Sequence, residues 1–200
     1  MFLTEEEILG TSAALKLTCD YFGQNAEMID AFFAANAQRK FTVMGCGSSY
    51  MLSKSAAAVL ASFPETAANA IPAGDYIADP AFWQDTVRGS IVLMLSRSGR
   101  TSEMVWAARK IKQSLGCPII SINAEADNDI TPMSDLELSM PWCHDNSVCQ
   151  TRTVTNLYAA ALLLAARYAK DDGLWQSVHD AAAGNEAFQA KYRPVLEGLA

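Results

Sequence analysis

The fold of this chain is decided by one stretch, the residues IVLMLSRSGRTSE that run from Ile91 to Glu103. Its first five residues are apolar without a break, and a polar turn that contains glycine follows them. An apolar run that ends in a turn signal predicts a buried strand of a parallel sheet. A helical pattern starts at Ser102, so the turn lies between the end of a strand and the start of a helix. Free N–H groups at a helix start attract anions, and the stretch therefore predicts an anion site.

Strand and helix patterns alternate along the rest of the chain, with short connections between them. Such an order predicts a parallel sheet that is covered by helices on both faces. The expected strands cover residues 41–44, 65–71, 91–95, 118–123 and, as an edge strand, 136–140; the expected helices cover 5–22, 26–37, 51–63, 102–115, 147–168 and 174–199; residues 72–75 are expected to be a loop and 80–83 a short helix or turn. The fold class is therefore α/β, a three-layer α/β/α sandwich with a five-stranded parallel sheet, flanked by N- and C-terminal helices.

Local signals predict how some of the helices begin and end. Thr4 and Glu7 have the spacing of a capping box at the start of the first helix. The longest helix is expected to open at about Ser147, with Val148 on its inner face. Pro194 is expected to kink or interrupt the last helix, because proline lacks an N–H donor.

The composition limits the classes of protein to consider. The chain has 200 residues, of which 50% are hydrophobic and 18% charged, as expected for one folded domain. Its net charge of −7 argues against a nucleic-acid surface, which needs clustered Lys and Arg. The start of the chain lacks the pattern of a secretion signal, and the longest apolar run, 159–166, is too short to span a bilayer. We therefore expect a cytoplasmic protein with no nucleic-acid or membrane partner.

The cysteines and histidines give no sign of a metal site. The five cysteines are odd in number and no two have a CxxC spacing, so reduced thiols are expected. Two histidines in the whole chain leave little for a metal cluster. No metal ion and no organic cofactor are expected.

A second turn has the same character as the first. Residues 45–49, with the sequence GCGSS, follow an expected strand and precede an expected helix, as residues 96–101 do. In an open parallel sheet, ligands bind outside the carboxyl ends of the strands, and both turns fall there. Glycine lets the backbone approach an anion closely, and hydroxyl groups add donors. Both turns are therefore candidates for holding a phosphate.

Other kinds of site also use turns that contain glycine and serine. A dinucleotide site is disfavoured because Tyr50 stands where the third glycine of GxGxxG belongs after Gly45 and Gly47. A P-loop is excluded because no GK[ST] occurs, and His144 and His179 have no GxSxG partner for hydrolysis. Serines that only cap helices remain an open alternative.

Three segments resemble the signatures of the sugar isomerase (SIS) domain, in the family's order and spacing. They are residues 45–50, 95–103 and 147–156. The best match is the first SIS domain of double-SIS proteins, which include the isomerase half of glutamine–fructose-6-phosphate transaminase, the tagatose-6-phosphate ketose/aldose isomerase group and fructosamine-phosphate deglycases. The resemblance covers about residues 30–170. It implies one SIS domain over residues 1–200 that binds a phosphorylated sugar or amino sugar.

The resemblance also assigns roles to individual residues. Arg97 replaces a common glutamine and Arg100 a common glutamate, which implies a more cationic pocket, and Asp145 is the nearest acid to a glutamate that the family often has. The segment 148–150 matches residues that line the sugar. The implied phosphate- and sugar-binding residues are Gly47, Ser48, Ser49, Ser96, Arg97, Ser98, Thr101, Val148 and Gln150.

The resemblance implies that catalytic acid and base groups come from a second SIS domain, of which this chain shows no motifs. Isomerisation needs a base near the reacting carbons and an acid for the ring oxygen. Glu103, His144 and Asp145 are the only candidates here, and His144 is expected at the surface. We therefore expect binding without a complete catalytic cycle, as part of an isomerase, aminotransferase or deglycase. A homodimer, or a second SIS domain that follows the segment 174–200, is expected to complete the site.

Two alternatives stay open. The first is a regulatory domain that senses phosphosugar without catalysis, and the second is a structural oligomerisation module. The second predicts no affinity for anions, so a phosphosugar titration separates it from the other two.

Overall fold

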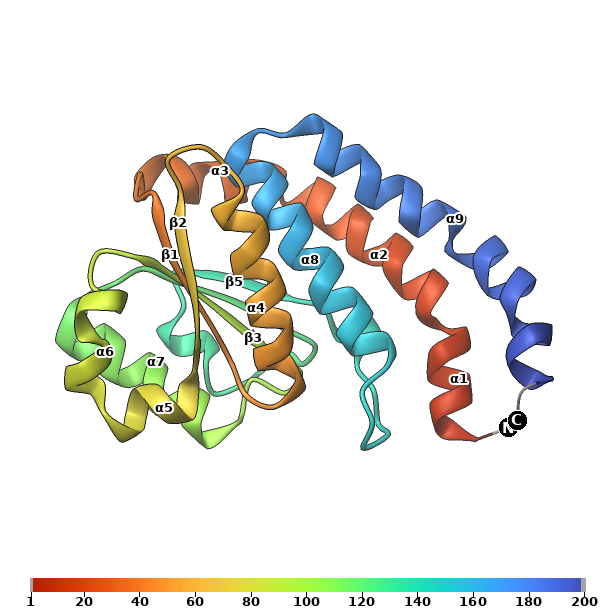
Figure 1. Ribbon diagram of the computed structural model, residues 1–200, viewed down its shortest axis with the longest axis horizontal. Coiled ribbons are helices and arrows are strands. Elements are labelled where there is room, and N and C mark those ends of the chain that lie inside the picture. The colour runs from red at the N-terminus through yellow and green to blue at the C-terminus, as the bar shows by residue number, and fades with distance from the viewer. Residues whose placement is uncertain (1, 199–200) are drawn as a thin grey trace.

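A computed structural model describes residues 2–198 of the chain and contains one parallel five-stranded sheet (Figure 1). The strand order is β2-β1-β3-β4-β5, and all four neighbouring pairs are parallel. The strands are β1 (Lys40–Gly45), β2 (Ala67–Pro72), β3 (Ile91–Ser96), β4 (Ile119–Asn123) and β5 (Leu136–Ser139). This confirms the predicted α/β class and the five-stranded parallel sheet.

The central strand β3 is buried along its whole length, as its apolar run predicted. Its side chains alternate between two cores. Leu93 and Leu95 face the core on one side of the sheet, while Val92 and Met94 face the core on the other. A strand that is apolar at every position suits this place, because both of its faces are covered.

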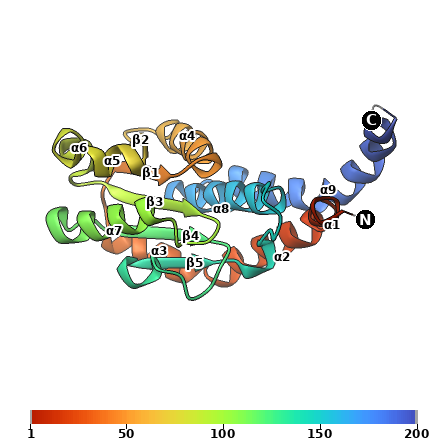
Figure 2. The same ribbon diagram turned by 90° about the horizontal axis from the view of Figure 1, so that it is seen from below.

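Helices cover both faces of the sheet. One face carries α2 (Thr11–Gln24), α3 (Ala26–Ala35), α4 (Ser48–Ala61) and α8 (Arg152–Ala169), and the other carries α5 (Ala73–Ala78), α6 (Pro80–Val87), α7 (Ser102–Leu115) and the short 3-10 helix η1 (Thr131–Met133). The long α9 (Asp172–Glu197) packs on α2 and α8, while a second 3-10 helix, η2 (Pro141–Cys143), follows β5. Figures 1 and 2 both show α1 (Leu3–Leu9) and the C-terminal part of α9 extending past the same end of the layered core.

The expected N-terminal helix is divided, and its expected capping box is wrong. The helix breaks at Gly10 into α1 and α2. The residue before α1 is Phe2, and no side chain caps this helix. Glu7 is buried and accepts hydrogen bonds from Asn146 and Ser147. The Glu7 carboxylate, which the local pattern assigned to the helix cap, therefore makes a tertiary contact instead.

The expected helix over 147–168 begins five residues late. Its first helical residue is Arg152, because the Asp145 carboxylate accepts the N–H groups of Thr151 (2.7 Å) and Thr153 (2.9 Å) and so fixes the start of α8. Val148 precedes the helix and is 92% exposed, so its predicted place on an inner face is wrong.

Two other expectations are corrected. The loop expected at 72–75 is in fact the end of β2 and the start of α5. Pro194 lies inside α9, which continues to Glu197, so the proline does not interrupt the helix. The short helix expected from Pro80 is confirmed and reaches Val87, since the Asp79 carboxylate accepts the N–H of Phe82 (3.0 Å) at its start.

Candidate functional site

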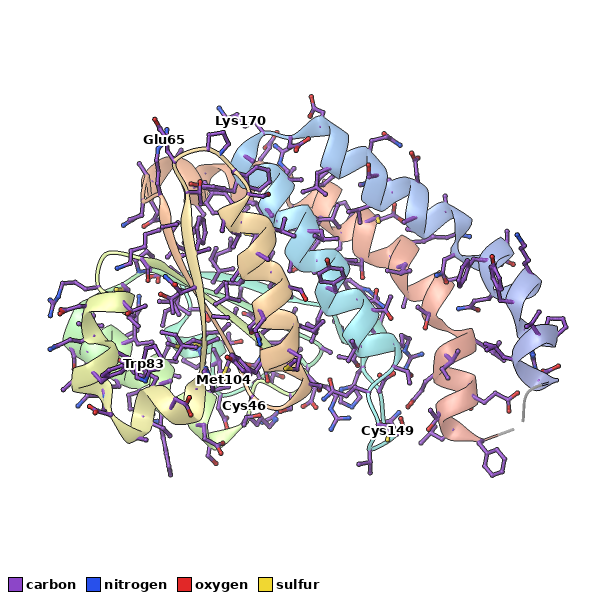
Figure 3. The ribbon with its side chains drawn as sticks, in the orientation of Figure 1. Cys46, Glu65, Trp83, Met104, Cys149 and Lys170 are labelled. Atoms are coloured by element: carbon purple, nitrogen blue, oxygen red, sulfur yellow. The ribbon has the colours of Figure 1, made fainter. Side chains whose placement is uncertain are left out.

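The two glycine- and serine-containing turns meet at the carboxyl edge of the sheet. The first connects β1 to α4 and the second connects β3 to α7, and these two strands are direct neighbours. Together with residue 150 they enclose a small cavity of about 90 Å³. Figure 3 shows Cys46 and Met104, which both line it, close together at one end of the sheet. The cavity is lined by Cys46, Ser49, Leu95, Ser96, Arg97, Ser98, Thr101, Met104 and Gln150.

The hydroxyl groups of Ser96 and Ser98 are oriented by the backbone of their own turn. The Ser96 Oγ accepts the N–H of Gly99 (3.0 Å), and the Ser98 Oγ accepts the N–H of Arg100 (3.2 Å). A hydroxyl that accepts in this way keeps its own O–H free to donate. Both serines are therefore prepared to donate hydrogen bonds to an anion in the cavity.

The start of α7 faces the same cavity. Thr101 is the residue before the helix, and its side chain makes no capping bond, so its hydroxyl is not used by the helix itself. The first N–H groups of a helix have no carbonyl partner and carry the positive end of the helix dipole. Thr101 and Met104, which both line the cavity, place this helix start against it.

Gly99 lets the turn after β3 pack closely against a neighbouring loop. Its φ is +62°, and a Cβ added there would lie 2.3 Å from the Asn128 side chain. The buried Asn128 in turn accepts the N–H groups of Ile130 (3.1 Å) and Thr131 (3.2 Å). Only glycine suits this position, because both the backbone conformation and the contact exclude a side chain.

The turn after β1 contributes less of the cavity than the sequence predicted. Ser49 is buried and lines it. Gly45 brings the strand end close to α4, since a Cβ there would lie 2.5 Å from the carbonyl carbon of Ser49. Gly47 and Ser48 are exposed and do not line the cavity.

The two arginines of the second turn have different surroundings. Arg97 lines the cavity, and its guanidinium donates to the carbonyl of Ser147 (2.9 Å). Arg100 instead points to the loop after β4, where it pairs with Glu125 (3.3 Å) and donates to the carbonyl of Asp127 (2.7 Å). Of the two arginines expected to make the pocket more cationic, only Arg97 lies at the cavity.

The segment 145–151 brings one predicted residue to the cavity and leaves another outside. Gln150 lines the cavity, and its Oε1 is buried without a hydrogen-bond partner. An unpaired buried acceptor is costly, so Gln150 is prepared to accept a hydrogen bond from a ligand. The Val148 side chain points into solvent and does not line the cavity.

The three candidates for acid–base chemistry lie outside the lining of the cavity. His144 is partly exposed, and its Nδ1 lies 3.4 Å from the Glu125 carboxylate. Asp145 is buried and holds the start of α8. Glu103 is exposed on the first turn of α7.

Three lining residues were not predicted from the sequence, namely Cys46, Leu95 and Met104. Burial raises the pKa of the Cys46 thiol, and the nearby Glu103 charge raises it further, so Cys46 is a neutral thiol at pH 7. Leu95 and Met104 are apolar, so their residue types do not indicate a phosphate site. The only signal in the sequence is that they lie close to the turn at residues 96–101.

A larger cavity, of about 650 Å³, lies elsewhere in the chain. Arg39, Arg167 and Lys170 are among its lining residues, and it sits at the amino ends of β1 and β2. Figure 3 shows Lys170 at the end of the molecule opposite Cys46. None of the sequence-predicted site residues lines it. The smaller cavity is the better candidate, because the oriented hydroxyl groups and the helix start meet there.

Over residues 2–198, no three His, Cys, Asp or Glu side chains are grouped to hold a metal ion. No helix among these residues has the length and apolar character needed to cross a membrane.

Comparisons with known proteins agree with this fold. The family model of the SIS domain matches residues 35–167, which is well over half of the chain. A search of curated proteins finds no match.

Solved structures give the fold independently of the family match. Tagatose-6-phosphate ketose/aldose isomerase from Escherichia coli is 20% identical with a TM-score of 0.82, covering 96% of this chain and 54% of its own. Glucosamine-6-phosphate deaminase from Thermotoga maritima is 24% identical with a TM-score of 0.78, covering 98% and 57%. The C-terminal domain of glucosamine-fructose-6-phosphate aminotransferase from Francisella tularensis is 16% identical with a TM-score of 0.76, covering 92% and 54%. The chain thus spans about half the length of these structures. The fold, the two turns and the family match together show that this chain belongs to the SIS domain family.

Proposed function

We propose that the chain is the phosphosugar-binding domain of a sugar-phosphate isomerase, aminotransferase or deglycase, and that the cavity between the two turns holds the phosphate. The observation that carries this proposal is the chemistry of the lining. The nine lining residues include Arg97 and four hydroxyl groups but no carboxylate, in a chain whose net charge is −7. Hydroxyl donors and a helix start, with no carboxylate in the lining itself, suit a phosphate.

The size of the cavity limits what it holds. About 90 Å³ is well below the ~300–1,000 Å³ of pockets that enclose a whole small molecule. The proposed phosphate therefore enters the cavity, while the carbon chain of the sugar extends past Gln150 toward the surface. In this proposal, a second copy of the protein or a second SIS domain covers the carbon atoms of the sugar. The similar structures are about twice as long as this chain, which supports the arrangement.

The proposal assigns binding to this chain and leaves proton transfer to the partner. The His144 Nδ1 lies 3.4 Å from the Glu125 carboxylate, Asp145 holds the start of α8, and Glu103 faces solvent. None of the three lines the cavity. The names of the similar structures, an isomerase, a deaminase and an aminotransferase, define the reaction classes that we propose for the whole protein.

The absence of an acid or base from the cavity lining also favours a second candidate, a regulatory domain that senses phosphosugar without converting it. An isomerisation assay with the purified chain, alone and mixed with candidate second domains, separates the two. Turnover in any mixture identifies an enzyme, whereas binding without turnover in all of them favours the sensor. In both cases the proposed location is the cytoplasm, which the five unpaired cysteines support.

Thermal shift measurements test the binding itself. Fructose, glucose and glucosamine 6-phosphates are titrated against the protein, with the free sugars as controls for the phosphate contacts. A phosphosugar at ~100 times its Kd stabilises the folded state by ~2.7 kcal/mol, which is ~5–11 °C for a domain of this size. If no phosphorylated sugar shifts the melting temperature, the chain is not a phosphosugar-binding domain.

A further inference from the structure

A short segment beside the cavity, Asp145 to Ser147, is held from two sides by charged side chains. On one side is Glu7, which comes from the N-terminal helix α1. Its carboxylate accepts the N–H of Asn146 (2.7 Å) and the N–H of Ser147 (3.0 Å), and it also accepts the Ser147 hydroxyl. Glu7 is only 2% exposed, so these bonds replace the water that its charge would otherwise require.

On the other side is Arg97, which comes from the turn after β3. Its guanidinium donates to the carbonyl of Ser147 (2.9 Å) and, at 3.4 Å, to the carbonyl of Asp145. The carboxylate thus takes the N–H groups of the segment, and the guanidinium takes its carbonyl groups. Bonds with a charged partner are stronger than neutral ones, so this arrangement fixes the segment relative to both α1 and the phosphate cavity.

The fixed segment leads directly to the cavity. Gln150 follows Ser147 by only three residues, so fixing Ser147 limits where Gln150 can lie. The single hydrogen of the Ser147 hydroxyl goes either to Glu7 or to the carbonyl of Cys149, whose oxygen lies 2.8 Å from the Oγ. Gln150 lines the cavity, whereas Glu7 does not. Glu7 makes no contact with the cavity, so its hydrogen bonds reach a ligand only through this segment. Figure 3 shows the loop with Cys149 at its tip, and the loop projects beside α1.

We propose that Glu7 and Arg97 are positioning residues that hold residues 145–147 between them and thereby place Gln150 at the phosphosugar site, an inference that rests on the proposed function. Glu7 lies outside the residues 35–167 that the family model matches. The N-terminal helix α1 is consequently part of the binding site and is not a separate structural addition.

Three variants test this role through Glu7, which leaves the cavity lining unchanged. Glu7→Ala removes all the acceptors. Glu7→Gln keeps one oxygen for the two N–H groups and lets the new amide donate to the Ser147 Oγ, so it serves as the conservative variant. Glu6→Ala removes an exposed carboxylate from the same helix and is the matched control.

Two readouts separate positioning from stability. The first is the Kd for the tightest-binding hexose 6-phosphate, measured by calorimetry at 25 °C. The second is the mobility of a spin label on Cys149, the exposed cysteine of the loop, without ligand. A Cys149→Ser variant corrects for labelling of the half-buried Cys46.

We expect Glu7→Ala to weaken binding by about tenfold or more and to increase the mobility of the label. Glu7→Gln is expected to stay within about threefold of the wild type, and Glu6→Ala to change neither readout. Folded Glu7→Ala protein with an unchanged Kd overturns the proposal, as does an unchanged label mobility.

Two further outcomes are also decisive. If Glu7→Ala does not fold at 25 °C, Ser147→Ala replaces it, because this variant removes one donor to the Glu7 carboxylate. Ser147→Ala must then increase the mobility of the label. An unchanged mobility overturns the proposal. If the wild type binds no phosphosugar, the proposed function fails and the positioning role fails with it. In that case the label mobility in Glu7→Ala still shows whether α1 holds the loop.

Discussion

Replacing Gly99 with alanine tests whether the turn at the cavity depends on close packing. Gly99 has a φ of +62°, where an L-residue costs about 1–2 kcal/mol. The new Cβ would lie 2.3 Å from Asn128, so that side chain must move away from its bonds. Asn128 accepts two backbone N–H groups and donates to the carbonyl of Glu125 (2.9 Å). At about 1 kcal/mol for each bond, the total loss is about 4–5 kcal/mol.

The assay is equilibrium denaturation in urea, which gives the free energy of unfolding for each variant. Gly116→Ala is the matched control, because Gly116 also has a φ of +62° but no atom within 4 Å of an added Cβ. It is expected to cost only the conformational part, about 1–2 kcal/mol.

A double variant isolates the contact with Asn128. In Gly99→Ala/Asn128→Gly the whole side chain is absent, including the Asn128 Cβ that would lie 2.6 Å from the added Cβ, and the three bonds are already lost. Its total cost should therefore be close to that of Gly99→Ala alone, well below the sum of the two single variants. The reasoning is refuted if Gly99→Ala costs no more than Gly116→Ala, or if the two single costs simply add.

Other consequences of the structure can be measured separately. Burial alone would raise the pKa of the Glu7 carboxyl, but its hydrogen bonds, chiefly those from Ser147, hold that pKa below the ordinary value of 4.5. Glu7 therefore stabilises the fold above pH 4.5, and this contribution is lost as the pH falls through the lower folded pKa. In Glu7→Gln, the free energy of unfolding should depend less steeply on pH in acid. An unchanged dependence on pH contradicts this. Burial raises the pKa of the Cys143 thiol to about 12, whereas Cys149 is exposed. At pH 8, a thiol reagent should therefore modify Cys149 quickly and leave Cys143 unreacted until the protein unfolds. A fast reaction of Cys143 in the folded protein would contradict its burial. Val148→Ala should change the free energy of unfolding by less than about 0.5 kcal/mol, because the side chain is 92% exposed, and a loss typical of a core residue would place Val148 inside after all.

The strand framework could be predicted from the sequence because local patterns and burial agree there. The run from Ile91 to Leu95 is apolar at every position, and the structure buries every one of these residues. The weak alanine-rich strand was also predicted, as β2, although alanine is a poor strand former. It lies at the edge of the sheet, where pairing with β1 supplies the bonds that propensity does not.

The segment after η2 could not be predicted, because its conformation depends on residues far away in the sequence. Glu7 lies 139 residues before Asn146, and a local pattern gives no sign of the bond between them. The same bond explains why the capping box was wrong. The contacts of the Asp145 carboxylate explain why α8 starts at Arg152 and not at Ser147. The turn after β3 was predicted more fully, since its serines bond to N–H groups within the turn itself.

The position of a bound phosphosugar tests the central proposal most directly. A crystal structure of the protein with a hexose 6-phosphate shows where the phosphate lies. We predict that its oxygens accept hydrogen bonds from the hydroxyl groups of Ser96, Ser98 and Thr101 and from the first N–H groups of α7. A phosphate bound instead in the larger cavity beside Arg39 and Lys170, or no bound ligand at saturating concentration, would contradict the proposal.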